Sequence, residues 1–356
     1  MNPPKYRVAI LANESLSDSL IWLESAKKLE SIVEFEVVDL IADNWLDKIV
    51  KGKFDALLAK PGGVRSDFKE LYDERIRAIE QQYFIFPSPQ EIYLYENKRF
   101  LSFWLKANGI PHPKTHVFYR KAEAREFVQK SGVWPLVAKM NIGASSSGVK
   151  IIKSQAQALD YIENTFGKGL KREVGPKWKK MKMARIFHLL THPQLIVGKF
   201  RLYKSIDSDV QKGFCIFQEY VQHDFEWRVV RIGDSFFAHK KMKLGELASG
   251  SLLKNYDNPP LSLFDFVKSF SDTHQLYSVA IDIFERSPDD YLVNEVQCIF
   301  GQSDQFQMMV DGKVGRYVSD NEQWCFEEGD FNGNQCFDLR LQWVLKNIQN
   351  ESTIRQ

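Results

Sequence analysis

Three oxygen-bearing side chains in the last third of the sequence have the types and spacing of a metal site. Asp282 lies in the apolar run VAID, and Glu295 and Gln297 lie in the run YLVNEVQ, which follows after a short turn. If the two runs are neighbouring strands, alternation puts Glu295 and Gln297 on one face, with Asp282 across the hairpin. Hard oxygen ligands suit Mg²⁺, and burying carboxylates is costly unless a cation compensates. The pattern predicts a Mg²⁺ site, with an ion pair to a core lysine as the alternative.

A second group of residues has the composition of a phosphate-binding loop between two strand-like runs. The loop contains Gly143, Ser145, Ser146, Ser147 and Gly148. Backbone N–H groups and hydroxyls in such a hairpin can donate to phosphate oxygens, and Lys139 on the preceding strand could meet the α-phosphate. An ordinary hairpin tip without a ligand is the alternative. The spacing is one residue too long for a nucleophile elbow, which argues against a serine hydrolase.

The first ninety residues contain the elements of an α/β domain. Strand-like runs at 6–12, 33–40, 54–60 and 83–89 alternate with helical patterns near 16–30, 43–51 and 66–81. This alternation predicts a parallel, doubly wound sheet. The turn after the first run has no glycine, so the dinucleotide-binding fingerprint is missing and a NAD-dependent enzyme is disfavoured.

The rest of the chain mixes helices with paired strands. A helix beginning near Lys98 ends at Asn108-Gly109, and the prolines after it force an extended chain. Further helices are predicted near 121–131, 154–165, 261–275 and 337–348, and strands at 134–140, 149–153, 214–221, 226–243, 277–285 and 290–297. A hairpin precedes the last helix. The fold class is therefore α/β followed by α+β.

Length and composition restrict the class of protein. The chain has 356 residues, which favours two or three domains, and 44% hydrophobic residues, which excludes a mainly disordered protein. A net charge of +2 gives no reason to expect a nucleic-acid or membrane-surface partner. No run approaches a membrane span and the start has no signal-peptide pattern, so we expect a cytoplasmic protein. The four cysteines form no CxxC pair, which argues against a zinc knuckle or a disulfide framework.

One segment has a strong local charge. Between Lys168 and Arg185 the chain carries eight basic residues against Glu173 alone, a local charge of +7. A solvated helix face or flexible insertion is the leading interpretation, and a patch that attracts a phosphorylated or otherwise anionic substrate is the alternative.

Taken in order, these motifs carry a family resemblance. They are Lys98 opening a helix, Lys139 before the Gly/Ser loop, Gln218-Glu219-Tyr220-Val221, Glu226-Trp227-Arg228, and Asp282 with Glu295 and Gln297. The chain resembles the ATP-grasp superfamily of carboxylate–amine ligases over about residues 1–305. The resemblance implies a Rossmann-like N-terminal domain (1–92) and two α+β subdomains that sandwich ATP (93–210 and 211–356). The basic insertion, about 168–210, exceeds the family core, and substrate recognition and oligomer contacts are both open roles for it.

The resemblance also implies roles in nucleotide binding. Lys98 and Lys139 would contact the phosphates, with the loop from Gly143 to Gly148 closing over them. The segment Gln218 to Val221, which includes Glu219 and Tyr220, would read the adenine amino edge. Glu226 would accept hydrogen bonds from the ribose hydroxyls.

Catalytic and metal-binding roles follow from the same resemblance. Arg228 would lie near the transferred phosphoryl group, and Lys240 or Lys241 would add charge there, a solvated strand edge being the alternative for either lysine. Asp282, Glu295 and Gln297 would ligate Mg²⁺, with Mn²⁺ also acceptable. The family usually has asparagine at the position of Gln297, and its longer side chain moves one ligand oxygen.

The substrate is less readable. Ser249, Gly250, Ser251 and Tyr256 fall where the family presents a small-residue loop to the acceptor carboxylate, and Gly301-Gln302-Ser303 follows the metal strand toward the same pocket. A role only as loops is the alternative. The C-terminal tail resembles tails of ATP-grasp proteins associated with bacterial surface-polysaccharide pathways, which suggests an amino acid or sugar-acid acceptor.

The implied reaction is ADP-forming ligation. A substrate carboxylate would attack the γ-phosphate, and an amine would capture the resulting acyl phosphate. The partners would be ATP, a small carboxylate and an amine, with homodimer formation left open. A small-molecule kinase on the same fold, or a nucleotide-binding protein without turnover, are the alternative functions.

Overall fold

The chain divides into two compact units. The computed structural model describes residues 6–14, 16–62, 65–143, 148–172, 208–244, 247–248, 253–300, 304–321 and 323–354. The larger unit comprises Met1–Gly62, Asp67–Pro113 and Val221–Gln356, and the smaller unit comprises Gly63–Ser66 and Lys114–Tyr220. The division at residues 92 and 210 that the resemblance implies stays a prediction.

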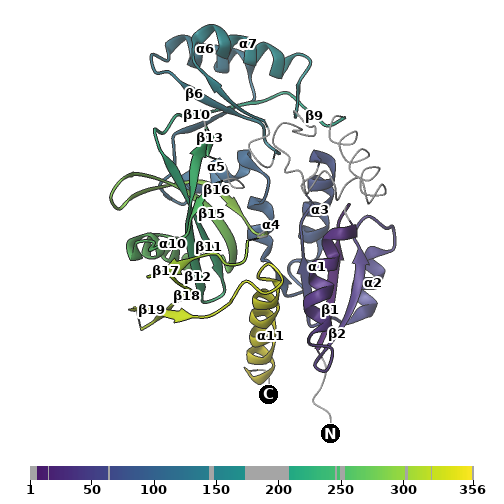
Figure 1. The fold of residues 1–356 in the computed structure, drawn as a ribbon. Coiled ribbons are helices and arrows are strands. Elements are labelled where there is room, and N and C mark those ends of the chain that lie inside the picture. Colours follow the sequence, from purple (N-terminus) through teal and green to yellow (C-terminus); the bar gives the residue numbers. More distant parts are fainter. Residues whose placement is uncertain are drawn as a thin grey trace, which may run out of the picture. The chain divides into compact units, whose positions relative to one another are not determined.

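The N-terminal part of the larger unit is a parallel sheet in the order β2-β1-β3-β4 (Figure 1). Its strands are β1 (Tyr6–Ala12), β2 (Val33–Asp39), β3 (Ala56–Ala59) and β4 (Ile85–Phe86), connected by α1 (Leu16–Lys27), α2 (Trp45–Gly52) and α3 (Ser66–Ile79). Val8 and Ile10 enter one hydrophobic core and Ala9 and Leu11 enter another, so β1 is apolar at successive positions. The predicted doubly wound sheet is confirmed.

Two short helices follow this sheet. In α4 (Pro89–Leu94) Ser88 and Glu91 form a capping box at the N-terminus. In α5 (Lys98–Ala107) the side chain of Asn97 accepts a hydrogen bond from the backbone N–H of Phe100, at 3.2 Å. This cap determines that Lys98 occupies the first helical position, as the sequence predicts.

A large sheet forms the C-terminal part of the same unit. Its strands are β11 (Phe225–Ile232), β12 (Ser235–Leu244), β13 (Leu247–Ala248), β14 (Lys254–Asn255), β15 (Ser278–Ser287), β16 (Asp290–Gln297), β17 (Met309–Val310), β18 (Lys313–Asp320) and β19 (Gln323–Glu328). Hydrogen bonds connect them in the order β16-β15-β11-β12-β18-β17, with β13 and β14 on β12 and β19 on β18. The turn between β11 and β12 needs Gly233, because its φ is +58° and a Cβ there would lie 2.4 Å from the Trp343 ring.

Two helices pack on this unit. α10 (Leu261–Thr273) lies against one face of the large sheet, where Phe264 contacts Phe236 at 6.3 Å between ring centroids. α11 (Phe337–Ile354) lies against α1, where Ser25 donates to Asp338 at 2.6 Å. The hairpin of β18 and β19 followed by α11 confirms the predicted C-terminal order of elements.

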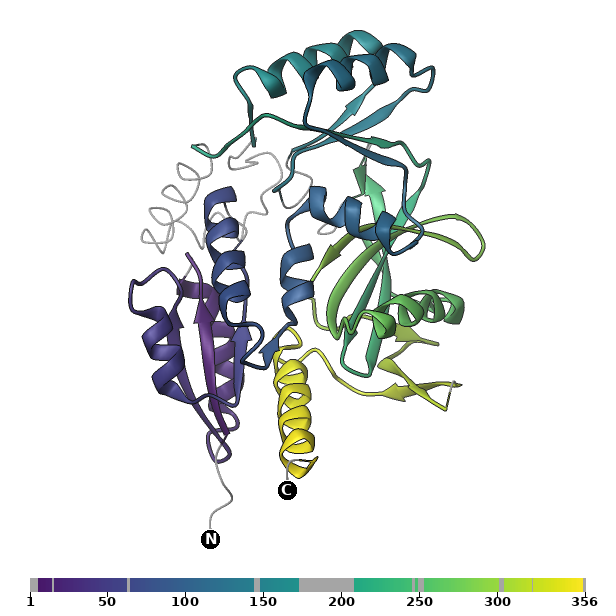
Figure 2. The same cartoon turned by 180° about the vertical axis from the view of Figure 1, so that it is seen from behind.

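The smaller unit is an antiparallel sheet with two helices on one face. Its elements are β5 (Thr115–Phe118), α6 (Lys121–Lys130), β6 (Leu136–Lys139), β7 (Val149–Ile152), α7 (Gln155–Phe166), β8 (Leu170–Lys171), β9 (Val210–Gln211) and β10 (Cys215–Glu219). The sheet order is β5-β10-β6-β7, with β8 paired to β9. Figure 2 shows α6 and α7 side by side on this sheet, where both helices contribute to its core.

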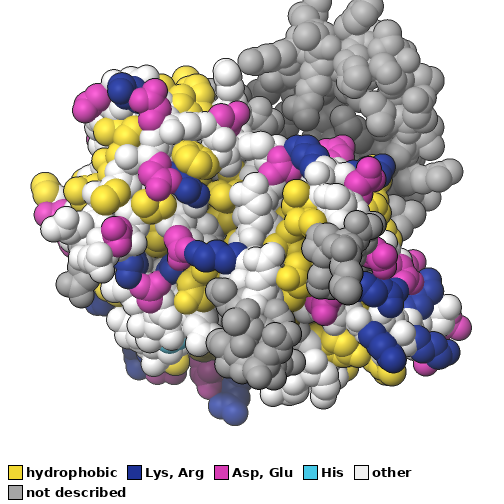
Figure 3. Space-filling model, turned by 90° about the horizontal axis from the view of Figure 1, so that it is seen from below, with side chains coloured by type: hydrophobic (Ala, Val, Ile, Leu, Met, Phe, Trp, Pro, Cys, Tyr) yellow, Lys and Arg dark blue, Asp and Glu magenta, His cyan; other side chains and the backbone are white. Residues whose placement is uncertain are grey.

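The surface and the cysteines agree with the composition. In Figure 3 basic and acidic side chains lie next to one another across the face that is shown, as a net charge of +2 predicts. All four cysteines are free thiols. In the part of the chain that the structure describes, no helix combines the length and apolar character that a membrane crossing requires. The cytoplasmic location stays a prediction.

Candidate active site

One face of the large sheet gathers most of the predicted site residues of the larger unit. Strand register pairs Arg228 with His239 on β12 and with Asp282 on β15, and it pairs Asp282 with Glu295 on β16. Directly paired residues of antiparallel strands point to the same side, and every second residue does so along a strand. We call this side the charged face; it carries Glu226, Arg228, His239, Lys241, Asp282, Glu295 and Gln297.

An ion-pair network connects the centre of the charged face. Arg228 donates to Asp282 through Nε to Oδ1 at 2.8 Å and through Nη2 to Oδ2 at 3.0 Å. Lys241 Nζ lies 2.6 Å from Asp282 Oδ2 and 2.8 Å from Glu226 Oε2. Asp282 is 2% exposed, and this full pairing is what makes its burial tolerable. The sequence analysis left open an ion pair to a core lysine as the alternative to a metal site, and Asp282 forms such a pair with Lys241.

The charges of this network reinforce one another. Burial alone would raise the pKa of the Asp282 carboxyl, but Arg228 and Lys241 outweigh burial and hold that pKa well below its ordinary value. Burial alone would lower the pKa of Arg228 and Lys241, and Asp282 reverses the direction for both. All three groups are therefore charged at neutral pH, and the two cations are held rigidly beside one carboxylate.

Lys98 approaches the same face from the N-terminus of α5. Its Nζ lies 3.6 Å from Glu295 Oε1 and 3.7 Å from Glu96 Oε2. The structure therefore brings Lys98, predicted to bind phosphate, beside Glu295, predicted to bind metal, although the two are far apart in the sequence.

The oxygen atoms of this region fit a hard cation whose coordination is partly supplied by the oxygens of a phosphate. Asp282 Oδ1 accepts one hydrogen bond and keeps a further lone pair, while Glu295 and Gln297 lie partly exposed on β16. Among the described residues, His, Cys, Asp and Glu side chains do not form a group of three that could hold a metal ion. Oxygen atoms from outside the protein would have to complete the coordination of Mg²⁺.

The stem of the Gly/Ser loop belongs to the smaller unit. The backbone N–H of Met140 donates to the carbonyl of Gly148 at 2.9 Å and closes the hairpin. Gln211 Oε1 accepts from the backbone N–H groups of Asn141 and Ile142, at 2.9 and 3.1 Å. Lys139 is buried at the end of β6. The stem is thus held by its own hairpin hydrogen bond and by the side chain of Gln211.

The strand order of both units can be compared with solved structures. The D-alanine–D-alanine ligase of Bacillus anthracis matches 99% of this chain and 100% of its own, with a TM-score of 0.50 and 13% identity. An ATP-grasp protein with a RimK domain from Sphaerobacter thermophilus matches 82% of this chain and 90% of its own, with a TM-score of 0.50 and 15% identity. The chain has the ATP-grasp fold. The fold that the resemblance implies is confirmed.

A third ATP-grasp structure carries a nucleotide. The N5-carboxyaminoimidazole synthetase of Staphylococcus aureus, solved with ADP, matches 85% of this chain and 73% of its own, with a TM-score of 0.51 and 12% identity. At these identities the likeness shows the fold. No protein-family model and no curated protein sequence matches the chain.

Within the ATP-grasp fold, the predicted adenine segment continues from β10. Gln218 Nε2 donates to Thr115 Oγ1 at 3.0 Å, and the backbone N–H of Glu219 donates to the carbonyl of Lys114 at 2.9 Å. Tyr220 ends the smaller unit, and Val221 begins the next segment of the larger unit. The segment thus lies at a passage of the chain from one unit to the other.

The structure separates two neighbouring lysines that the sequence grouped together. Lys240 points to the face opposite Lys241, with its Nζ 4.2 Å from the centroid of the Phe225 ring and 4.9 Å from that of Trp227. It makes cation–π contacts there and does not join the charged face. Strand alternation along HKKMK is the sequence signal that distinguishes the two.

A polar group extends the charged face beyond the predicted residues. Tyr256 donates to Asp304 Oδ2 at 2.8 Å, and Lys254 forms an ion pair with the same oxygen. The Tyr256 ring lies 5.1 Å from the His239 ring. His239, Lys254 and Asp304 were not singled out from the sequence. The register of β12 on β11 pairs His239 with Arg228, the register of β14 on β12 pairs Lys254 with Lys241, and Lys254 holds Asp304.

Several predicted residues lie outside the described residues. They are Ser145, Ser146 and Ser147 of the Gly/Ser loop, Ser249, Gly250 and Ser251, Gly301-Gln302-Ser303, and residues 173–207 of the basic insertion.

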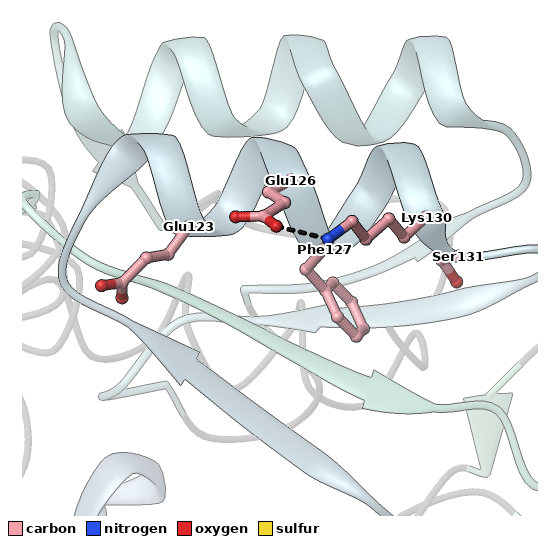
Figure 4. Close-up of a pocket in the computed structure, with 5 residues that line it drawn as sticks. All are labelled: Glu123, Glu126, Phe127, Lys130 and Ser131. Carbon is pink, nitrogen blue, oxygen red and sulfur yellow. Dashed lines mark hydrogen bonds and ion pairs between the residues drawn. The ribbon is translucent and has the colours of Figure 1, made fainter.

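A surface hollow of about 350 Å³ lies elsewhere, on α6 of the smaller unit (Figure 4). Glu126 and Lys130 form an ion pair across it at 2.5 Å, and both side chains are exposed. The hollow is open, and none of its lining residues belongs to the predicted nucleotide site.

Proposed function

We propose that this protein is an ATP-dependent, ADP-forming ligase that joins a carboxylate to an amine through an acyl phosphate. The observation that carries the proposal is the charged face of an ATP-grasp fold, where Arg228 and Lys241 are held around Asp282 and Lys98 lies beside Glu295. Solved proteins of this fold include ligases, one of them solved with ADP. Fixed cations beside carboxylate ligands suit a reaction in which a phosphoryl group is transferred.

Nucleotide binding would use the residues that the family resemblance implies. Lys98 and Lys139 would contact the phosphates, and the Gly/Ser loop from Gly143 to Gly148 would cover them. The segment from Gln218 to Val221 would bind adenine through its backbone. Glu226 would accept from the ribose hydroxyls in addition to its present donors, Lys241 at Oε2 (2.8 Å) and Asn294 at Oε1 (3.3 Å).

Asp282, Glu295 and Gln297 would hold Mg²⁺ together with phosphate oxygens. When bound, the metal would neutralise charge on the phosphates. On the protein side, four carboxylates, Glu96, Glu226, Asp282 and Glu295, lie beside the cations of Lys98, Arg228 and Lys241. This set carries one net negative charge, which favours a cation, and the nucleotide would add its own negative charge.

In the first step, an oxygen of the substrate carboxylate attacks the γ-phosphorus, and ADP leaves with the electron pair of the broken P–O bond. Arg228 and Lys241 would stabilise the charge on the transferred phosphoryl group. In the second step, the amine nitrogen attacks the acyl carbon, and phosphate leaves with the electron pair of the C–O bond. The surplus proton on nitrogen passes to phosphate or solvent. The Gly/Ser loop would exclude water from the acyl phosphate.

The substrate would be a small polar carboxylate, an amino acid or a sugar acid. Tyr256 supports this choice through its position beside Asp304 and Lys254, which present both signs of charge. The segment Ser249-Gly250-Ser251 would contribute to the same pocket.

Trapping of the acyl phosphate tests the function. The protein is incubated with Mg²⁺, ATP, a carboxylate library and hydroxylamine, and we expect ADP together with a hydroxamate for at least one carboxylate. A stable phosphorylated product without hydroxamate would instead show a kinase. Binding of ATP without release of ADP would show a nucleotide-binding protein without turnover.

Two variants test the assigned sites. Glu295→Ala should abolish Mg²⁺-dependent turnover and leave thermal unfolding close to wild type, and unchanged turnover would contradict the metal assignment. Lys139→Ala should mainly weaken ATP binding, measured by calorimetry. An unchanged affinity for ATP would show that the Gly/Ser loop is not the phosphate lid.

A further inference from the structure

His239 is a buried hydrogen-bond acceptor on the charged face. It lies opposite Arg228 in the register of β11 and β12, and it is 1% exposed. Its Nδ1 lies 3.1 Å from the backbone carbonyl of Gln307. A carbonyl only accepts, so Nδ1 carries the hydrogen and Nε2 keeps its lone pair. Within the described residues Nε2 has no hydrogen-bond partner, and a buried acceptor without a partner is destabilising.

The surroundings keep this imidazole neutral. Burial lowers the pKa of His239 to about 3, and the charges of Arg228 and Lys254 act in the same direction. Asp282 and the hydrogen bond to Gln307 oppose the shift without reversing it. At neutral pH the ring therefore presents an acceptor at Nε2 and no charge.

The two cations also decide what kind of donor fits this acceptor. Arg228 and Lys254 are each paired with a carboxylate, Asp282 and Asp304, so no net negative charge at Nε2 attracts an ammonium ion, whereas an uncharged amine needs only the acceptor. An uncharged amine offers an N–H to Nε2 and keeps the lone pair that attacks an acyl phosphate. His239 is directly paired with Arg228, the residue proposed to contact the transferred phosphoryl group.

We propose that Nε2 of His239 accepts a hydrogen bond from the amine substrate in its uncharged form, and so binds and orients the second substrate of the ligase. The inference rests on the proposed function and adds to it the residue that receives the nucleophile. Asp304, which already accepts from Tyr256 and Lys254, borders the same place with a carboxylate and would face the polar remainder of the amine substrate.

A matched pair of variants isolates the Nε2 position. His239→Asn keeps an N–H donor near the position of Nδ1, toward the Gln307 carbonyl, and removes the acceptor at Nε2. His239→Gln places an amide oxygen near Nε2 and loses the contact with Gln307. His239→Asn therefore keeps the hydrogen bond to Gln307 and loses the proposed bond to the substrate, and His239→Gln does the reverse. Thermal unfolding shows whether each variant is folded.

Steady-state kinetics measure the substrate bond. The carboxylate found by hydroxamate trapping is combined with ATP and with ammonium chloride or each of the twenty amino acids as the amine. We expect His239→Asn to raise KM for the amine at least about ten-fold, and His239→Gln to stay within about three-fold.

A second measurement does not depend on turnover. ¹⁵N NMR of histidine-labelled protein with a non-hydrolysable ATP analogue should show the Nε2 signal of His239, assigned by its loss in His239→Asn. We expect that signal to shift on addition of the preferred amine and to stay in place with the carboxylate alone.

Two outcomes separate this inference from the proposed function. Wild-type turnover with an unchanged amine KM in His239→Asn, or a stationary Nε2 signal, would overturn the assignment of His239 and leave the ligase intact. Wild-type protein that forms neither ADP nor hydroxamate would overturn the ligase and the assignment together.

Discussion

The two faces of the sheet formed by β11, β12, β15 and β16 are both buried, and they are buried in different ways. On the face toward α10, Val229, Ile281 and Ile283 pack with no exposed surface. On the charged face, at the alternate positions of the same strands, Arg228 and Asp282 are held by ion pairing. Burial of apolar area is non-directional, whereas burial of charge needs a partner at a fixed distance.

This difference determines where sequence changes are tolerated. The apolar face can lose a methyl group and repack, because its stabilisation is spread over many contacts. The charged face concentrates its stabilisation in a few pairs, so removal of one partner leaves the others buried and uncompensated. We therefore expect the largest losses of activity and stability from substitutions on the charged face and the smallest from substitutions on the apolar face.

Asp282→Ala should have the largest effect. It leaves Arg228 and Lys241 buried without their shared carboxylate, so we expect no measurable ADP formation and a loss of about 3–5 kcal/mol in urea unfolding. The pKa of Asp282 is depressed in the folded state, so its stabilisation is present above the unfolded value of 3.8 and is lost as pH falls below it. Wild type should therefore lose more stability than the variant between pH 5 and about pH 3. Equal acid sensitivity of the two proteins would contradict the ion-pair network.

Lys241→Met should come second. The variant removes a cation from the proposed phosphoryl site but keeps the aliphatic bulk of the side chain, so we expect ADP formation to fall by about 100-fold. Coupled-assay kinetics at saturating ATP measure this change. Activity within a factor of about two of wild type would exclude Lys241 from the reaction.

Ile281→Val tests the opposite face beside Asp282. It removes one buried methylene from the core under α10, and we expect a loss of about 0.5–1.5 kcal/mol in urea unfolding with unchanged kcat. A fall in kcat without a fall in stability would show that the two faces are not independent.

Lys240→Met should have the smallest effect and is the control for Lys241→Met. Its Nζ lies over the rings of Phe225 and Trp227, away from the charged face, so the variant loses cation–π contacts worth at most about 1 kcal/mol. ADP formation should stay within a factor of about two of wild type. Equal losses of ADP formation in the two lysine variants would show that removal of any positive charge from this strand lowers activity, whichever face the lysine lies on.

Much of the fold could be predicted because local patterns decide it. The apolar runs of β1 and β3 and the helical patterns between them are sufficient for a parallel sheet, and Asn108-Gly109 predicts the end of α5. The hairpin of β15 and β16 follows from two apolar runs around a polar turn. In the site, the same hairpin brings Asp282 opposite Glu295 as the spacing indicates.

The rest of the candidate site could not be predicted, because it depends on how the strands of the large sheet pair with one another. Local alternation is enough to show which residues lie on strands, that Glu295 and Gln297 share a face, and that Lys240 and Lys241 lie on opposite faces. It took the tertiary contacts to show that Lys241 is the one on the side of Asp282, that His239 is paired with Arg228, and that Lys254 is paired with Lys241. These outcomes depend on the register of β11, β14 and β15 against their neighbours, and a shift of one residue in that register would reverse every side chain.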